Sequence, residues 1–134
     1  MHCFTKTMSQ SGNKYIRSMS KINLLPKTIQ EELRSKSLLK VISGLNNFEP
    51  QSVKTISEAA SLGGADLVDI ACKPQLVETA IKISSLPVCV SSVEPKLFLD
   101  SVKAGASLIE IGNYDTFYAQ GITFSDTKVL NLTK

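Results

Sequence analysis

The chain has 134 residues, 43% of them hydrophobic, which is enough for one folded domain with its own core. Its three cysteines and single histidine exclude a disulfide framework, a histidine-based metal site and a Ser-His-Asp triad, and its apolar runs fall short of the ~20 residues that span a membrane. Residues 1–37 hold seven basic and two acidic residues and residues 38–134 hold eight basic and ten acidic ones, so the net charge of +3 indicates no surface for nucleic acid on the body of the chain.

Residues 1–37 differ in composition from the rest of the chain. Residues 1–25 contain scattered Ser, Lys, Met and Asn, no acidic residue and no sustained hydrophobic period. This composition fits a disordered basic extension and an organelle transit sequence equally well. Pro26 can then open a short helix near residues 27–36, in which Ile29 and Leu33 share a face that can plug one end of a barrel.

From residue 38 onward, short apolar strands alternate with helices. The first strand is predicted over residues 38–43. Three prolines each follow a charged residue and open a helix, since proline fits the first helical position; they are Pro50, Pro74 and Pro95. The later strands are predicted over residues 65–71, 88–91 and 106–111, and Ser125 can cap a last helix. This alternation with short connections predicts a parallel sheet with right-handed crossovers.

One strand sequence in this pattern occurs twice along the chain. Residues 64–71 read GADLVDIA and residues 105–112 read GASLIEIG, a spacing of roughly 20 residues per strand-helix unit, as in a TIM-barrel-like fold. Side chains alternate along a strand, so Asp69 and Glu110 occupy equivalent positions on one face, while the other face is wholly apolar and suits packing under helices. The two carboxylates are therefore predicted to face the interior of a barrel.

Four strand-helix units are half the number that closes such a barrel. A sheet of four strands leaves two unpaired edges and an uncovered inner face, so we expect an α/β half-barrel that a partner or a missing second half completes. If the half-barrel is the whole chain, self-association through these edges is expected. A small open sheet covered on one face is the alternative.

Several sequence motifs identify a family. They are LKVISGLNNF (39–48), GGADLVDIAC (63–72), PVCVSSVEP (87–95), AGASLIEIGNYDTFY (104–118), GITFS (121–125) and VLNLT (129–133). In this order they closely resemble the hypothetical chloroplast reading frame 23 family, over about residues 38–134. Members occur in algal plastid genomes and in cyanobacteria, so the resemblance implies a plastid location and a strand-helix barrel, and no particular reaction.

The resemblance also implies a longer protein. Members continue for roughly as many residues again beyond the match, so this chain resembles their amino-terminal half, and their later half resembles a phosphate-binding barrel end. The extension of residues 1–37 favours a nuclear copy with a transit sequence. We therefore expect the full-length protein to be an enzyme that binds a small phosphorylated metabolite, with its cofactor unassigned. A non-catalytic plastid binding or regulatory scaffold and an inactive truncated fragment are the alternatives.

The candidate catalytic residues are Asp69 and Glu110. Two shielded carboxylates from second-neighbour strands can have their pKa values pushed apart and so divide the roles of acid and base. The alternative is structural: the two are hydrogen-bonded to loop groups or paired with a buried lysine such as Lys40. Sequence alone does not separate these two interpretations.

The candidate ligand-binding residues follow the strand ends at one mouth of the barrel. They are Asn46, Asn47, Ser91, Glu94 and Asn113. Asparagine is also an ordinary turn residue, and Glu94 directly precedes Pro95, so turn geometry and helix capping compete with binding. Cys72 and Cys89 are expected to be small buried residues, because no histidine is available to activate a thiolate, and no metal site is assigned.

Overall fold

The computed structural model describes residues 22–112 and 114–134, and the chain divides after residue 37 into two compact units. In the first unit, helix α2 (Lys27–Ser35) follows Pro26 and ends at Lys36, whose backbone is left-handed with φ +62°. The extension predicted over residues 1–25, disordered or transit-like, falls mostly on residues 1–21, outside the described residues.

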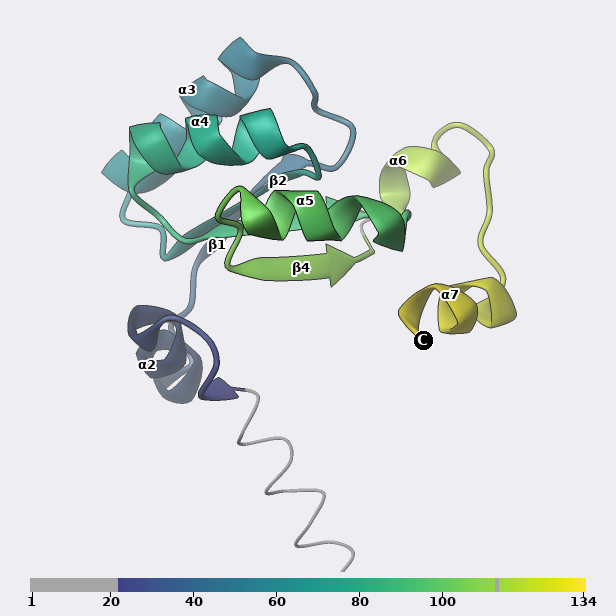
Figure 1. Ribbon diagram of the computed structural model, residues 1–134, viewed down its shortest axis with the longest axis horizontal. Coiled ribbons are helices and arrows are strands. Elements are labelled where there is room, and N and C mark those ends of the chain that lie inside the picture. The colour runs from purple at the N-terminus through teal and green to yellow at the C-terminus, as the bar shows by residue number, and fades with distance from the viewer. Residues whose placement is uncertain (1–21, 113) are drawn as a thin grey trace, which may run out of the picture. The chain divides into compact units, whose positions relative to one another are not determined.

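The second unit, Leu38–Lys134, is the predicted α/β half-barrel. Its four parallel strands lie in the order β1-β2-β3-β4, and helices connect them (Figure 1). The strands are β1 (Lys40–Gly44), β2 (Leu67–Ala71), β3 (Val88–Ser92) and β4 (Leu108–Ile111). The helices are α3 (Pro50–Leu62), α4 (Pro74–Ser84), the 3-10 turn η1 (Pro95–Leu97), α5 (Phe98–Lys103), α6 (Asp115–Tyr118) and α7 (Asp126–Thr133). Among the helices described, none combines the length and the hydropathy needed to cross a membrane.

The three prolines open helices as predicted, but two identical Glu-Pro pairs behave differently. Before Pro50, the Glu49 carboxylate accepts hydrogen bonds from the backbone N–H groups of residues 51 and 52, which caps α3. Before Pro95, the Glu94 side chain makes no such cap and pairs with Lys96 instead. The third helix accordingly starts as a 3-10 turn and becomes α-helical only at Phe98.

The repeated segments form β2 and β4, and both strands start two residues later than predicted. Ladder pairing begins at Leu67 and Leu108, opposite Lys40 and Cys89. Ala65 and Ala106 are buried in the preceding turns, which the glycine before each alanine makes possible with a positive φ. The turn before β2 is also tied to the chain before β1, because the Asp66 carboxylate accepts a hydrogen bond from the Leu39 N–H at 2.7 Å.

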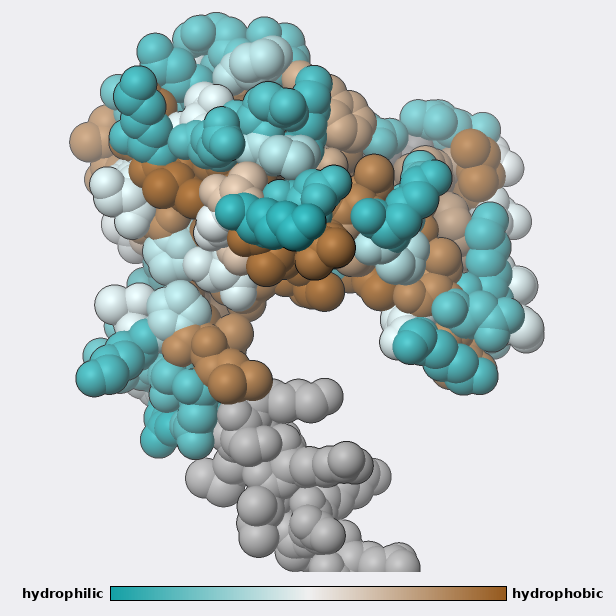
Figure 2. Space-filling model, viewed as in Figure 1, coloured by the Kyte–Doolittle hydropathy of each residue, from teal (hydrophilic) through white to brown (hydrophobic). Residues whose placement is uncertain are grey.

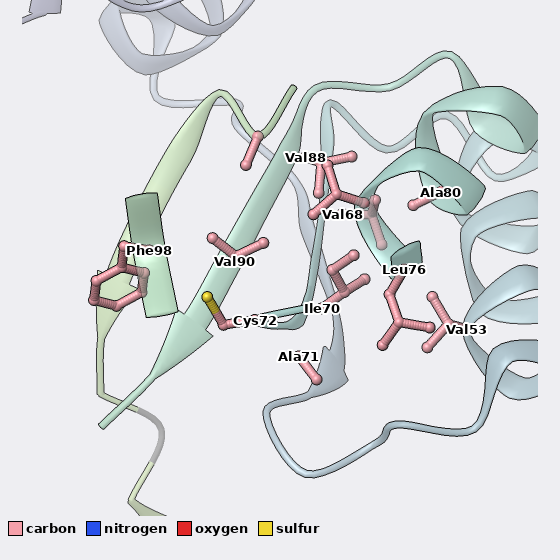
Figure 3. Close-up of a cluster of buried hydrophobic side chains, with 12 residues drawn as sticks. Val53, Val68, Ile70, Ala71, Cys72, Leu76, Ala80, Val88, Val90 and Phe98 are labelled. Carbon is pink, nitrogen blue, oxygen red and sulfur yellow. The ribbon is translucent and has the colours of Figure 1, made fainter. Parts of the chain in front are cut away.

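The helix-facing side of the sheet carries the hydrophobic core, shown in Figure 3. The strands contribute Val68, Ile70, Val88 and Val90, and the helices contribute Val53, Leu76, Val77, Ala80 and Phe98. All nine side chains are at most 6% exposed. The apolar face of the repeated strand thus packs under the helices, as its alternation predicts.

The two edges of the sheet are less well covered than its centre. At the β4 edge, Ile109 is 52% exposed, and Leu99 and Val102 of the neighbouring α5 are exposed as well. Apolar residues are visible along this side of the unit in Figure 2. At the β1 edge, Val41 and Leu39 line an apolar groove of about 250 Å³ against α3. Both edges therefore keep apolar surface that one layer of helices does not bury.

Candidate functional site

The face of the sheet opposite the core holds a cluster of three charged side chains. Lys40 of β1 extends its ammonium between the two predicted carboxylates, with Nζ 3.1 Å from Asp69 Oδ2 and 2.5 Å from Glu110 Oε2. In a flat sheet, β1 and β4 would lie about 14 Å apart, three strand spacings of about 4.8 Å. A contact between their side chains therefore requires the sheet to curl, with this face on the concave side.

Asp69 is the buried member of the cluster. Its side chain is 1% exposed, and its Oδ1 accepts a hydrogen bond of 2.6 Å from the Ser91 hydroxyl of β3. Burial raises the pKa of the Asp69 carboxyl above its usual value, against the opposing effects of Ser91 and Lys40. Glu110 differs, because its side chain remains 37% exposed. Only one of the two carboxylates is thus open to an approaching molecule.

Lys40 is held as a cation. Burial lowers the pKa of its ammonium, but hydrogen bonds and charge attraction from Glu110 and Asp69 outweigh this, and the net pKa lies above the usual value. A lysine that stays protonated is no nucleophile, so imine formation at Lys40 is disfavoured. Two of its three N–H donors are used within the cluster, and the third remains for a bound molecule.

Cys89 of β3 adds a thiol to this face. Its sulfur and the carboxylate oxygens of Asp69 and Glu110 all lie within 4.8 Å of one another, a spacing that a metal ion could bridge. Burial, however, raises the pKa of the Cys89 thiol to about 12, which disfavours the thiolate that a metal would need. The Lys40 ammonium also lies against both carboxylates. The donor set therefore fits an ion-pair cluster better than a metal centre.

A cavity of about 210 Å³ opens at the carboxyl ends of β1, β2 and β3, and we call it the mouth cavity. Its walls are formed by Leu45, Asn46, Phe48, Cys72, Ser91, Ser92, Val93, Glu94, Leu97 and Phe117. The predicted residues Asn46, Ser91 and Glu94 are among them, so the structure brings these three together. Their positions follow from parallel strands, whose carboxyl ends all meet at one edge.

The remaining predicted site residues lie elsewhere. The Asn47 side chain donates hydrogen bonds to the hydroxyls of Ser43 and Ser52, at 2.8 and 2.9 Å, and so closes the loop between β1 and α3. Asn113 lies outside the described residues. Asp69 and Glu110 do not line the mouth cavity. Asp69 pairs with Cys89, two residues before Ser91 on β3, whereas Glu110 pairs with Ser91 itself, on the far side of β3 from β2.

Ser91 connects the two parts of the site. Its residue lines the mouth cavity, while its hydroxyl donates to Asp69 in the charged cluster. Sequence reasoning proposed Ser91 from its place at a strand end, but it missed the apolar walls Phe48, Leu97 and Phe117. Phe117 follows β4 and has no strand-end position of its own, so only the folded arrangement brings it to the cavity.

Comparison with known proteins places these features in a family. The family described as "Protein of unknown function (DUF561)" matches residues 23–134. "Uncharacterized protein ycf23" of Cyanophora paradoxa is 50% identical over 107 residues, which cover 79% of this chain and 44% of that protein. The protein of the same name from Antithamnion sp. is 39% identical over 113 residues, covering 84% and 41%.

This chain therefore spans less than half the length of the curated relatives it matches. Among solved structures, it is similar to the Xanthomonas albilineans dihydropteroate synthase in complex with indole-2-carboxylic acid and 6-chloroguanine. That likeness has a TM-score of 0.41 and 22% identity, over 54% of this chain and 34% of the synthase.

Proposed function

This chain belongs to the DUF561 family, and from that premise we propose that the full-length protein is a barrel enzyme performing acid-base chemistry on a small phosphorylated metabolite. The observation that carries the proposal is the Lys40 cluster, an ammonium between two carboxylates on the concave face of the sheet. In barrels of this kind, reactive groups project from the carboxyl-terminal parts of the strands. Glu110 lies in the second half of β4, whereas Lys40 begins β1 and reaches Glu110 across the sheet.

The cluster is costly as a purely structural device. Removing a carboxylate such as Asp69 from water costs several kcal/mol, and apolar side chains of similar volume often stabilise a core as well or better. The neighbouring residues Leu67 and Leu108 on the same face show that apolar side chains fit there. A chemical role explains why charged side chains occupy positions on this face that leucine could fill.

The geometry suggests separate roles for the three charged groups. Glu110 is the group that can exchange a proton with substrate, because its carboxylate is partly exposed. Lys40 can donate its third N–H to a substrate oxygen and stabilise negative charge that develops on it. Asp69 is a positioning residue, since it is buried and holds both Lys40 and Ser91.

The phosphate of the substrate is proposed to bind outside this chain. The cluster carries one positive and two negative groups, so a phosphate would meet a net negative charge there. In TIM barrels, phosphate sites generally follow strands seven and eight. Such strands would belong to the length of the curated relatives that this chain does not span.

We also propose a plastid location, supported by the algal relatives named ycf23. For the 134-residue chain taken alone, we propose self-association through the unpaired edges of β1 and β4, where Ile42 and Ile109 are each 52% exposed. Size-exclusion chromatography with light scattering should give a mass above 14.5 kDa. A monodisperse monomer would contradict this second proposal.

One observation favours a non-catalytic scaffold instead: Lys40 hydrogen-bonds to both carboxylates, so the cluster is largely satisfied without a ligand. Thermal denaturation of a full-length family member with and without sugar and heterocycle phosphates separates the two functions. The enzyme proposal predicts stabilisation by at least one compound, and its loss in variants matching Lys40→Met and Glu110→Gln. An exposed-surface variant matching Glu58→Gln, on α3, should respond like the parent.

If the cluster variants keep the full ligand response, the proposed roles of Lys40 and Glu110 are wrong. If no compound stabilises the protein and a protein partner co-purifies with it in a fixed ratio, the scaffold function is favoured. Turnover measured against pH on the stabilising compound then tests Glu110 directly, because Glu110→Gln should lower the rate by about 10²-fold or more.

A further inference from the structure

The walls of the mouth cavity are mainly apolar. Five of its lining residues are Leu45, Phe48, Val93, Leu97 and Phe117. Phe48 and Leu97 remain 48% and 38% exposed although they border a concavity, so a bound apolar surface would remove them from water. At about 210 Å³ the cavity is smaller than the roughly 300–1,000 Å³ of drug-sized sites. It therefore fits one ring system and not a whole metabolite.

The charges around the cavity disfavour an anion and a sugar. None of the described residues that line it is basic, and its one charged residue is Glu94, a carboxylate. A phosphate placed there would meet the like charge of Glu94, and Lys96, which pairs with that carboxylate, does not line the cavity. A sugar carries a hydroxyl on nearly every carbon, and burying these against leucine and phenylalanine would leave most of them without hydrogen bonds.

The polar residues that line the cavity are Asn46, Ser91, Ser92 and Glu94. The Glu94 carboxylate accepts hydrogen bonds from N–H groups, and its surface ion pair with Lys96 at 2.9 Å leaves its second oxygen available. Ser91 is 1% exposed and its hydroxyl donates to Asp69, so it borders the cavity and links it to the charged cluster. The exposed Asn46 amide offers both a donor and an acceptor.

From these contacts we infer that the mouth cavity binds a flat, uncharged nitrogen heterocycle with N–H donors on one edge. The inference rests on the proposed function and names its substrate class: a heterocyclic metabolite whose ring lies in this cavity. Ser91 would place that ring beside the Lys40 cluster, and the phosphate would lie farther away. A simple sugar phosphate is disfavoured as the substrate.

A matched pair of probes tests the N–H edge on the 134-residue chain. 2-Aminoquinazolin-4-one and quinazolin-4-one share the same fused ring, but only the first carries an amino group beside its ring N–H. Titrations followed by protein NMR should show tighter binding of the amino compound, with shifted amide signals at residues 91–94. Ribose 5-phosphate should neither shift these signals nor displace the heterocycle.

Two pairs of variants test the assigned residues. Glu94→Gln should weaken binding of the amino compound about tenfold, because a hydrogen bond to a charged group is lost, while the control Glu58→Gln on α3 should not. Phe48→Ser should also weaken binding, whereas Leu62→Ser, at a side chain 85% exposed on α3, should leave it unchanged. All four positions are exposed, so the variants are expected to fold.

Equal binding of the two probes, equal binding by Glu94→Gln and Glu58→Gln, or displacement by ribose 5-phosphate would overturn this inference. Those results leave the proposed function intact if the full-length protein still loses its metabolite response in the Lys40 and Glu110 variants. Conversely, heterocycle binding in this cavity with no effect of the Lys40 and Glu110 variants on turnover would overturn the proposed chemistry alone.

Discussion

The two copies of the repeated strand have similar sequences, but their acidic residues lie in different environments. Asp69 in β2 and Glu110 in β4 occupy the same place in the repeat and contact the same ammonium, Lys40. Yet the Asp69 side chain is 1% exposed and that of Glu110 is 37% exposed. Strand β2 has a neighbour on each side and β4 lies at the sheet edge. Position in the sheet, and not the local sequence, therefore decides which carboxylate is structural and which is accessible.

The largest expected difference between the two copies is the unfolding free energy lost when each carboxylate is removed in turn. Asp69→Ala should cost about 3 kcal/mol of unfolding free energy, because it leaves the buried Ser91 hydroxyl and part of the Lys40 charge without a partner. Glu110→Ala should cost less than about 1 kcal/mol, as expected of a partly exposed pair. Urea denaturation of the 134-residue chain at pH 7 measures both. Equal losses would show that edge and centre do not differ as the exposures indicate.

The glycines that begin the two copies give the next largest contrast. Gly64 and Gly105 have φ of +75° and +111°, so alanine is strained at both, by roughly 1–2 kcal/mol. At Gly105 an added Cβ would also lie 2.8 Å from Ile81 Cδ1, whereas the space at Gly64 is open. Gly105→Ala should therefore be the more destabilising, by about 1 kcal/mol of overpacking.

Ile81→Val, which removes Cδ1, supplies the check on that assignment. In a double-mutant cycle it should recover the extra cost of Gly105→Ala and leave the cost of Gly64→Ala unchanged. No coupling between residues 81 and 105 would mean that the steric contact is not the cause.

The helix-facing residues of the two copies should differ in the same sense. Val68 is fully buried in the core, and Ile109, its counterpart in β4, is 52% exposed. Val68→Ala should cost about 1.5 kcal/mol, at ~0.8 kcal/mol for each methyl group removed, and Ile109→Ala should cost less although it removes more atoms. Thermal denaturation at low protein concentration compares them. A greater cost for Ile109 at higher concentration would indicate that association buries the β4 edge.

The face on which each side chain lies could be predicted from sequence, because alternation along a strand has a period of two residues. That period placed Asp69 and Glu110 together and the Val68 and Ile109 positions toward the helices, and proline spacing located the helix starts. Pairing of the carboxylates with a lysine such as Lys40 is one of the two interpretations that the sequence allows. The half-barrel therefore follows from local patterns that the structure confirms.

Two features could not be predicted from the sequence: the curvature of the sheet and the side-chain contacts made in the loops. Periodicity does not say how strongly a sheet curls, so the reach of Lys40 across the sheet to Glu110 was not predictable. Glu49 and Glu94 each precede proline, yet only Glu49 caps its helix, because Glu94 pairs with Lys96. Asn47 resembled a ligand-binding residue, but its amide is used by two serine hydroxyls of its own loop.

The smallest expected effect concerns Lys40, which joins the two copies. Its pKa is raised in the folded chain above the usual 10.5, so the folded state retains the proton longer than the unfolded state does. The stability that Lys40 contributes should thus be fully present below pH 10.5 and be lost as the pH rises through its higher folded value. The difference in unfolding free energy between the parent and Lys40→Met should shrink across this interval. Lys54→Met, on the exposed side of α3, is the control for removing a lysine outside the cluster. A difference between the parent and Lys40→Met that does not change with pH would mean that the Lys40 ammonium gains nothing from lying between Asp69 and Glu110.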